Sequence, residues 1–137
     1  MWNYIRMTNA TKSAWQNIPE QLIVAYLPDS MRDLLHFIPL QAVLSIVDTY
    51  GGTRIHISSS PKSDYGMAGL IGFQYAKALA DYAGGSTIEI PRLTKMRQRV
   101  RHKAILDSLA RGASQRDTAR AFDMTERNVR MIIKKYN

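Results

Sequence analysis

The hydrophobic residues in the last third of the chain recur at the spacing of an α-helix. Over residues 94–111 they fall on one face, and cationic side chains cover much of the remaining surface. The stretch ends at Arg111 and Gly112, a basic last turn followed by a residue that readily adopts a positive φ. The pattern predicts one long helix. Its apolar face consists of Met96, Val100, Ala104, Ile105 and Leu109.

Two shorter helices are predicted after this one. Ser114 is a suitable N-cap, and Asp117 three residues later resembles the acidic member of a capping box. Asp123 stands where the chain must turn sharply, and Asp tolerates the left-handed region better than most residues. Thr125 then caps the third helix, so the order of elements predicts a helix-turn-helix unit. The apolar face of the third helix consists of Val129, Ile132, Ile133 and Tyr136.

The opposite face of the third helix is cationic and rich in hydrogen-bond donors. Such a face suits the major groove of DNA, where Arg can bond guanine through two hydrogen bonds and Lys can reach base edges or phosphates. Arg127 is the first choice for base recognition, whereas Lys135 is expected to contribute to binding any duplex. The DNA-binding residues predicted from this unit are Ser114, Gln115, Arg116, Thr125, Arg127, Asn128, Arg130, Met131, Lys134 and Lys135.

The first half of the chain repeats itself once at an offset of 33 residues. Each copy contains an amphipathic helix, a glycine pair that ends it, and a short alternating strand, over residues 53–58 and 86–91. The second helical stripe is expected to run without a break from Met67 to Tyr82. The glycine pairs follow helices and precede strands, the reverse of the order in phosphate-binding loops, so they are interpreted as helix caps. Asp48, Gly51, Gly52, Ile55 and Ile57 correspond to Asp81, Gly84, Gly85, Ile88 and Ile90.

Two short strands form a sheet that is only marginally stable by itself. The apolar area of the two helical faces is also larger than the area that such a sheet can cover. We therefore expect a homodimer through residues 30–91. The predicted fold class is mostly α with short β-strands. A helical dimerisation domain with a small β-ribbon, residues 28–91, is followed by a C-terminal helix-turn-helix DNA-binding domain, residues 92–137. Residues 1–27 form an N-terminal arm with a helix that ends near Tyr26.

The distribution of charge favours a nucleic-acid partner. Residues 1–91 carry six Lys/Arg and seven Asp/Glu, whereas residues 92–137 carry thirteen and four, so the net charge of +8 is concentrated in the last third. A block of one sign on a structured segment raises affinity for a polyanion through counterion release. A solvated basic tail is the alternative interpretation.

Composition argues against several other classes of protein. The absence of Cys excludes disulfides, thiolate zinc sites and cysteine nucleophiles. His36, His56 and His102 fit no metal-ligand spacing, so neither a metal nor another cofactor is expected. No nucleophile elbow, Walker loop or paired-carboxylate pattern is present, so the chain is not expected to be an enzyme. Its longest apolar run, residues 22–27, is too short to cross a bilayer, and we expect a cytoplasmic protein without membrane association.

Three segments carry a resemblance to a known family. They read Tyr50-Gly-Gly-Thr-Arg-Ile-His-Ile57, Ala83-Gly-Gly-Ser-Thr-Ile-Glu-Ile-Pro-Arg92 and Thr125-Glu-Arg-Asn-Val-Arg-Met-Ile-Ile133. Over residues 36–135 the chain resembles the Mor/C transcription activators of Mu-like transposable phages and prophages. The resemblance implies a dimerisation domain joined by a strand to a DNA-binding domain. It also implies activation of phage middle or late promoters with the RNA polymerase of the bacterial host.

The chain departs from this family at the strand before Pro91. Members usually carry there an aromatic residue proposed to approach the minor groove, whereas this chain has Glu89. Because phosphates repel a carboxylate, Glu89 is not expected to make the minor-groove contact proposed for the aromatic residue. It is expected instead to pair with Arg54 or His56 on the neighbouring strand. The resemblance leaves Thr87 and Arg92 as further candidate DNA contacts.

Together these features predict a dimeric, sequence-specific transcription activator that binds double-stranded DNA. Two recognition helices would enter successive major grooves and read an imperfect inverted repeat, and activation would require contact with RNA polymerase. A repressor or architectural DNA-binding protein would share this footprint. An adaptor whose first half binds protein would instead show no salt-dependent binding to duplex DNA. An enzymatic alternative, such as a recombinase fragment, rests on DNA affinity alone.

Overall fold

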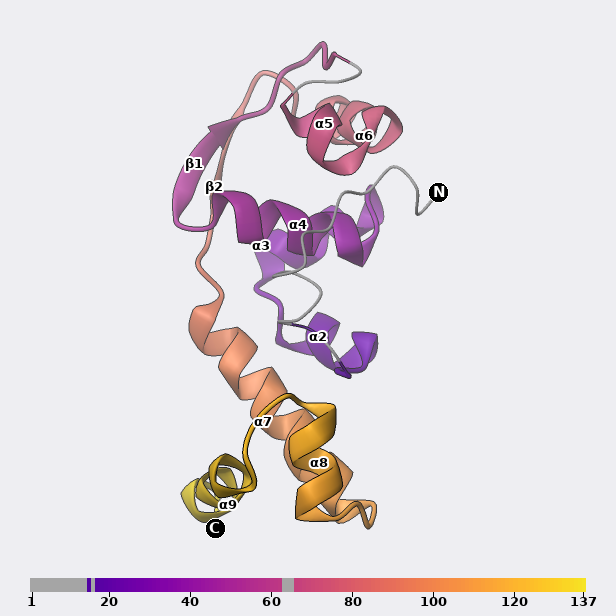
Figure 1. Ribbon diagram of the computed structural model, residues 1–137. Helices are drawn as coiled ribbons and strands as arrows, with labels where there is room; N and C mark the ends of the chain where they lie inside the picture. The colour runs from indigo at the N-terminus through magenta and orange to yellow at the C-terminus, as the bar shows by residue number, and fades with distance from the viewer. Residues whose placement is uncertain (1–14, 16, 63–65) are drawn as a thin grey trace. The chain divides into compact units, whose positions relative to one another are not determined.

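The structure is a computed structural model that describes residue 15, residues 17–62 and residues 66–137 (Figure 1). Within these residues the chain is mostly helical with a two-stranded antiparallel sheet, which confirms the predicted fold class. The chain separates into two compact units. The first unit contains Leu27–Leu93, and the second joins Trp15–Tyr26 to Thr94–Asn137. Most of the expected N-terminal arm lies outside the described residues.

The first unit is built around one buried helix, α4 (Leu40–Tyr50). Residues 42–47 of α4 are all buried, because this helix packs against η2, α5 and both strands. These elements therefore share a hydrophobic core with α4. In chain order, the other described elements of the first unit are α3 (Asp29–Arg32), the 3-10 turn η2 (Asp33–His36), β1 (Thr53–His56), α5 (Met67–Ile71), α6 (Phe73–Ala83) and β2 (Thr87–Ile90).

The glycine pairs cap helices, as the sequence predicted. The first glycine of each pair, Gly51 or Gly84, ends α4 or α6, and a Cβ at Gly51 would lie 2.6 Å from the carbonyl oxygen of Val47. The second glycine, Gly52 or Gly85, has a φ of +85° and donates its N–H across to the opposite strand segment at 2.7 Å. The 33-residue repeat thus builds two turns of the same geometry, each of which leads into one strand of the sheet.

The two strands are each shorter than predicted and pair with one another. Their antiparallel register places Thr53 opposite Ile90 and Arg54 opposite Glu89. Two guanidinium nitrogens of Arg54, Nε and Nη2, both lie 3.0 Å from Oε1 of Glu89. Of the two partners expected for Glu89, the structure therefore selects Arg54, because the register places their side chains on the same face of the sheet.

The apolar stripe from Met67 to Tyr82 does not form one helix, and that expectation was wrong. Gly72 interrupts it with a φ of +93° and a ψ of 150°, a combination that residues with a side chain essentially never adopt. The break separates α5 from α6, and the two helices then pack against each other. Helical spacing is preserved on both sides of the glycine, so the periodicity alone does not reveal the break.

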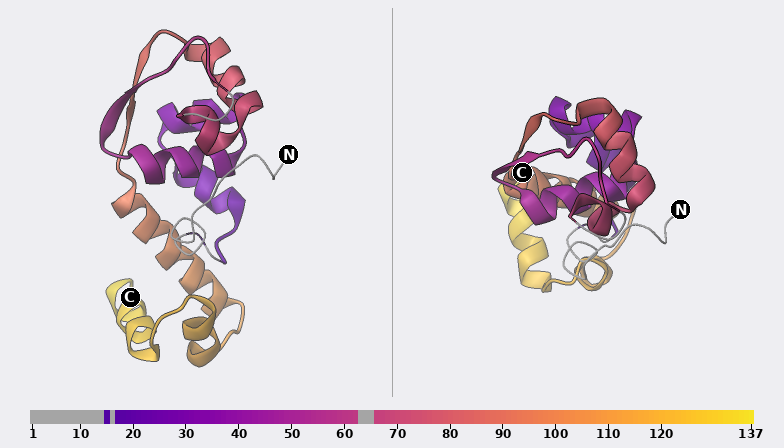
Figure 2. Two further views of the ribbon diagram at one scale, coloured as in Figure 1. Left: turned by 45° about the horizontal axis from the view of Figure 1, so that its top comes forward. Right: turned by 90° about the horizontal axis from the view of Figure 1, so that it is seen from above.

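The described residues of the second unit form four helices: α2 (Glu20–Tyr26), α7 (Thr94–Ala110), α8 (Gln115–Ala121) and α9 (Glu126–Lys135). The short helices α8 and α9 pack against each other and against α7, and Figure 2 shows that they are steeply inclined to one another. The segment that contains α2 precedes Leu27–Leu93 in the sequence, yet α2 packs against α7. The buried residues of α7, α8, α9 and the intervening turn are Val100, Ala104, Ile105, Thr118, Ala119, Phe122, Val129 and Ile132.

Candidate nucleic-acid interface

Helix α9 is held at its start by a side-chain cap and along one side by apolar packing. The hydroxyl oxygen of Thr125 accepts a hydrogen bond from the N–H of Asn128 at 3.1 Å, which satisfies one of the free donors of the first turn. Val129 is fully buried and Ile132 is 8% exposed, so the apolar face predicted from the sequence faces the core of the unit. This packing fixes which side of α9 remains in solvent.

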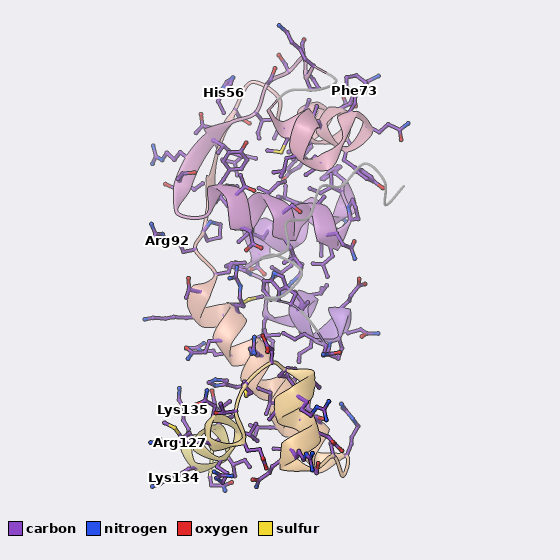
Figure 3. All side chains as sticks on the ribbon, in the orientation of Figure 1. His56, Phe73, Arg92, Arg127, Lys134 and Lys135 are labelled. Atoms are coloured by element: carbon purple, nitrogen blue, oxygen red, sulfur yellow. The ribbon has the colours of Figure 1, made fainter. Side chains whose placement is uncertain are left out.

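The side of α9 that remains in solvent carries the cations predicted to bind DNA. Arg127, Arg130, Lys134 and Lys135 are exposed, and Met131 is 59% exposed between them. Figure 3 shows Arg127, Lys134 and Lys135 extending from α9 on the side away from α8. Among the described residues, no ion pair or side-chain hydrogen bond engages Arg127, Arg130 or Lys134. Their donors are therefore available to an external anion.

The helix before α9 starts in the manner predicted. Ser114 is the N-cap of α8, and its hydroxyl oxygen accepts a hydrogen bond from the N–H of Asp117 at 3.0 Å. Gln115 and Arg116, on the first turn of α8, are exposed like the cap itself. Asp123 has a φ of 53°, which confirms the left-handed turn expected between the two helices. The turn is therefore short, and α9 starts three residues after Asp123.

Two cations of α7 are already engaged within the unit. Nζ of Lys103 lies 2.9 Å from Oδ1 of Asp107, and this hydrogen bond raises the pKa of the lysine. The guanidinium of Arg101 donates to the carbonyl of Phe122, at the end of α8. The basic character of α7 is therefore partly structural, because Arg101 serves the turn before α9.

The sequence did not indicate a contact between α7 and the end of α9. Nδ1 of His102 and the hydroxyl of Tyr136 are hydrogen bonded at 2.9 Å, and their rings meet edge to face. Partial burial lowers the pKa of His102, and the charges of Lys135 and Arg101 lower it further. The imidazole is therefore neutral at neutral pH. Tyr136, predicted on the apolar face, is 47% exposed because its hydroxyl reaches this surface contact.

The remaining predicted DNA contacts belong to the first unit. Thr87 starts β2 and is exposed, and Arg92 is exposed two residues after that strand ends. The side chain of Arg92 passes directly over Gly52, where a Cβ would lie 2.4 Å from its Nε. Gly52 thus leaves room for the arginine beside the turn that starts β1. Arg92 and His56 are labelled in Figure 3.

The model of the Mor transcription activator family matches residues 41–137 of the chain. This match covers most of the chain, including α7, α8, α9 and the duplicated part of the first unit. The chain belongs to the Mor transcription activator family. No curated protein and no solved structure matches it. The resemblance expected from the three sequence segments is therefore confirmed at the level of the family.

Membership in the Mor family assigns the chain to DNA-binding activators of transcription, a regulatory and non-enzymatic class. In the described part of the chain, no group of three or more His, Cys, Asp or Glu side chains could hold a metal ion. None of the described helices is both long and apolar enough to cross a bilayer. Helix α2 lies before the region that the family model matches.

Proposed function

We propose that this Mor-family chain is a homodimeric, sequence-specific activator of phage or prophage promoters that acts with the RNA polymerase of a bacterial host. In this proposal residues 92–137 bind double-stranded DNA, with α9 in the major groove, and residues 28–91 hold two copies together. Two α9 helices would then read an imperfect inverted repeat.

The observation that supports the DNA-binding part is the division of α9 into two faces. Its buried face, Val129 and Ile132, leaves no freedom to rotate the helix without exposing the core. Its solvent face carries Arg127, Arg130 and Lys134, whose donors are not engaged within the described residues. An α-helix that presents long cationic donors in this way fits the width of the major groove.

The observation that supports dimerisation is an aromatic pair on the surface of the first unit. The rings of Phe37 and Tyr82 stack with centroids 4.3 Å apart, yet 39% of Phe37 and 50% of Tyr82 remain exposed. Exposed stacked aromatic rings are typical of protein interfaces, because they offer a large apolar area at a small entropic cost. A second copy of the chain would cover them.

Reconstituted transcription combined with footprinting tests the proposed function. The wild-type chain is expected to protect an imperfect inverted repeat just upstream of a phage promoter and to raise transcription by bacterial RNA polymerase from it. Protection over the start of transcription, with reduced synthesis, would instead identify a repressor. Binding that is undetectable or independent of salt would support the adaptor alternative.

Two variants of α9 then test the assignment of its faces. Arg127→Ala is expected to reduce the free energy of binding to the protected site by about 1–3 kcal/mol and to weaken discrimination between bases at the position that Arg127 contacts. Lys135→Ala is the matched control, because it removes one exposed cation from the same helix and should weaken binding to specific and random duplexes alike. Equal losses for both variants on both duplexes would contradict the assignment of Arg127 to base recognition.

Sedimentation tests the dimer separately. Tyr82→Lys is expected to shift the chain toward the monomer, because a second copy would have to bury the new charge. Lys77→Ala, an exposed change on the same helix outside the aromatic pair, should leave the equilibrium unchanged. A wild-type chain that stays monomeric at micromolar concentration would refute the proposed dimer.

A further inference from the structure

The turn between α8 and α9 is held partly by a residue that lies more than one hundred positions earlier in the sequence. The last four carbonyls of an α-helix have no partner within the helix and must find donors elsewhere. At the end of α8, three of these carbonyls accept hydrogen bonds from backbone N–H groups of Phe122, Asp123 and Met124. The fourth, of Ala121, accepts from Nδ2 of Asn17 at 2.5 Å.

Asn17 is itself fixed by its neighbours. Trp15, two positions before Asn17, is 7% exposed, and Ile18, the next residue, is 8% exposed. Both side chains are therefore anchored in the second unit. The guanidinium carbon of Arg97 in α7 lies 5.1 Å from the centre of the Trp15 ring. The φ of Asn17 is 61°, a left-handed conformation that Asn accepts more readily than most residues. The amide is thus presented to α8 by a backbone that cannot turn away without moving two buried side chains.

We propose that Asn17 is a positioning residue for DNA recognition, and that the segment Trp15–Tyr26 completes the DNA-binding unit from outside the region that defines the family. The carbonyls of Ala121 and Phe122 adjoin the turn. Asn17 binds the first and Arg101 binds the second. Together they tie the turn to the upstream segment and to α7. Because α9 starts directly after this turn, its direction depends on both contacts.

This inference deepens the proposed function, because it assumes that α9 binds DNA. It also assigns a role to a segment that charge and helical periodicity place apart from the DNA-binding helices. Asn17 does not have to touch DNA in this role. Its removal should therefore reduce affinity most where recognition depends on the exact placement of α9, which is on a specific site rather than on random duplex.

The test uses the full chain with two substitutions of Asn17 and one control. Asn17→Asp keeps the size and the tolerance of a positive φ but replaces the donor by a carboxylate oxygen that the Ala121 carbonyl repels. Asn17→Gly keeps the backbone conformation and removes the side chain, so it serves if the first variant folds poorly. Gln21→Glu adds the same charge at an exposed position of α2 and keeps the Asn17 side chain.

Two measurements are made on each variant. The first is amide hydrogen exchange at residues 122–125, which is expected to accelerate in both Asn17 variants and not in Gln21→Glu. The second is affinity, well below the unfolding temperature, for a duplex selected by the wild-type chain and for a random duplex. Both Asn17 variants are expected to lose up to about tenfold on the selected duplex, the effect of one hydrogen bond, and clearly less on the random one.

The outcomes separate this inference from the proposed function. Unchanged exchange at the turn, or Asn17 variants that bind the selected duplex like the wild type, would overturn the positioning role even if their unfolding temperature fell. If the wild-type chain preferred no duplex at all, the proposed function would fail, and the exchange measurement would still decide whether Asn17 positions the turn.

Discussion

Thr125 combines two roles that substitutions can separate, because the same residue caps α9 and stands among the residues predicted to face DNA. Its hydroxyl accepts the N–H of Asn128 at 3.1 Å, and removal of an N-cap hydroxyl costs about 1 kcal/mol, within a range of about 0.5–2. For a domain of about 60–100 residues, a loss of about 1 kcal/mol in the free energy of unfolding lowers the unfolding temperature by roughly 4–8 °C. Thr125→Ala is therefore expected to lower thermal stability by that amount.

Thr125→Asp should have the opposite combination of effects. An aspartate caps a helix as well as threonine does, and its charge is favourable at the positive end of the helix dipole, so stability should be retained or raised. Near a phosphate, however, the same charge costs about 1 kcal/mol or more, which corresponds to at least a fivefold loss of affinity for any duplex. Thr125→Ser keeps the hydroxyl and is expected to preserve both properties.

Calorimetry and a duplex-binding titration at fixed salt measure these two properties on the same samples. Each variant is expected to lose one property relative to the wild type. Thr125→Ala should have a lower unfolding temperature, and Thr125→Asp should bind DNA with lower affinity. Duplex affinity that is unchanged in Thr125→Asp would show that the start of α9 does not approach the phosphates. Reduced stability in that variant would show that the cap geometry is not what stabilises the helix.

Three further expectations follow from other contacts. Arg54 and Glu89 form an ion pair whose side chains are each 74% exposed, so a double-mutant cycle of unfolding energies should give a coupling below about 1 kcal/mol, and a larger value would contradict the exposed geometry. Gly72→Ala should cost about 1–3 kcal/mol of stability in chemical denaturation, because its φ of +93° and ψ of 150° suit glycine alone; a neutral effect would refute the break between α5 and α6. Burial lowers the pKa of His102 below the 6.5 of an unfolded histidine, and the charges of Lys135 and Arg101 lower it further. As the pH falls, the unfolded chain therefore takes up the proton before the folded chain does. The free energy of unfolding should decrease as the pH drops below about 6.5. His102→Gln should flatten that slope in denaturation curves at pH 7.5 and 5.5, and an unchanged slope would exclude this histidine as its source.

Much of the second unit follows local rules that act within a few residues. Ser114 and Thr125 cap helices by accepting an N–H three residues ahead, and Asp123 turns the chain by its own backbone preference. These features depend only on neighbouring residues, so the sequence was sufficient to predict them. The solvent face of α9 also followed from periodicity, since Val129 and Ile132 had to be buried.

The 33-residue repeat carried further information, because two copies of one pattern indicate which residues occupy corresponding places. Both glycine pairs have the geometry that this correspondence implied, and Glu89 pairs with one of the two partners expected for it. The choice between Arg54 and His56 nevertheless required the strand register. Register depends on how both strands leave their glycine turns, and that is a property of the packed unit.

Local patterns therefore predicted α7, α8 and α9, the caps of α8 and α9, the cationic face of α9 and the family of the chain. The break of the stripe from Met67 to Tyr82 at Gly72 is evident from the folded chain alone, because helical spacing is the same on both sides of the break. Only the tertiary structure joined Asn17 to Ala121, 104 positions apart. A carbonyl at a helix end accepts any donor that packing brings within reach, and no local pattern specifies where in the chain that donor lies.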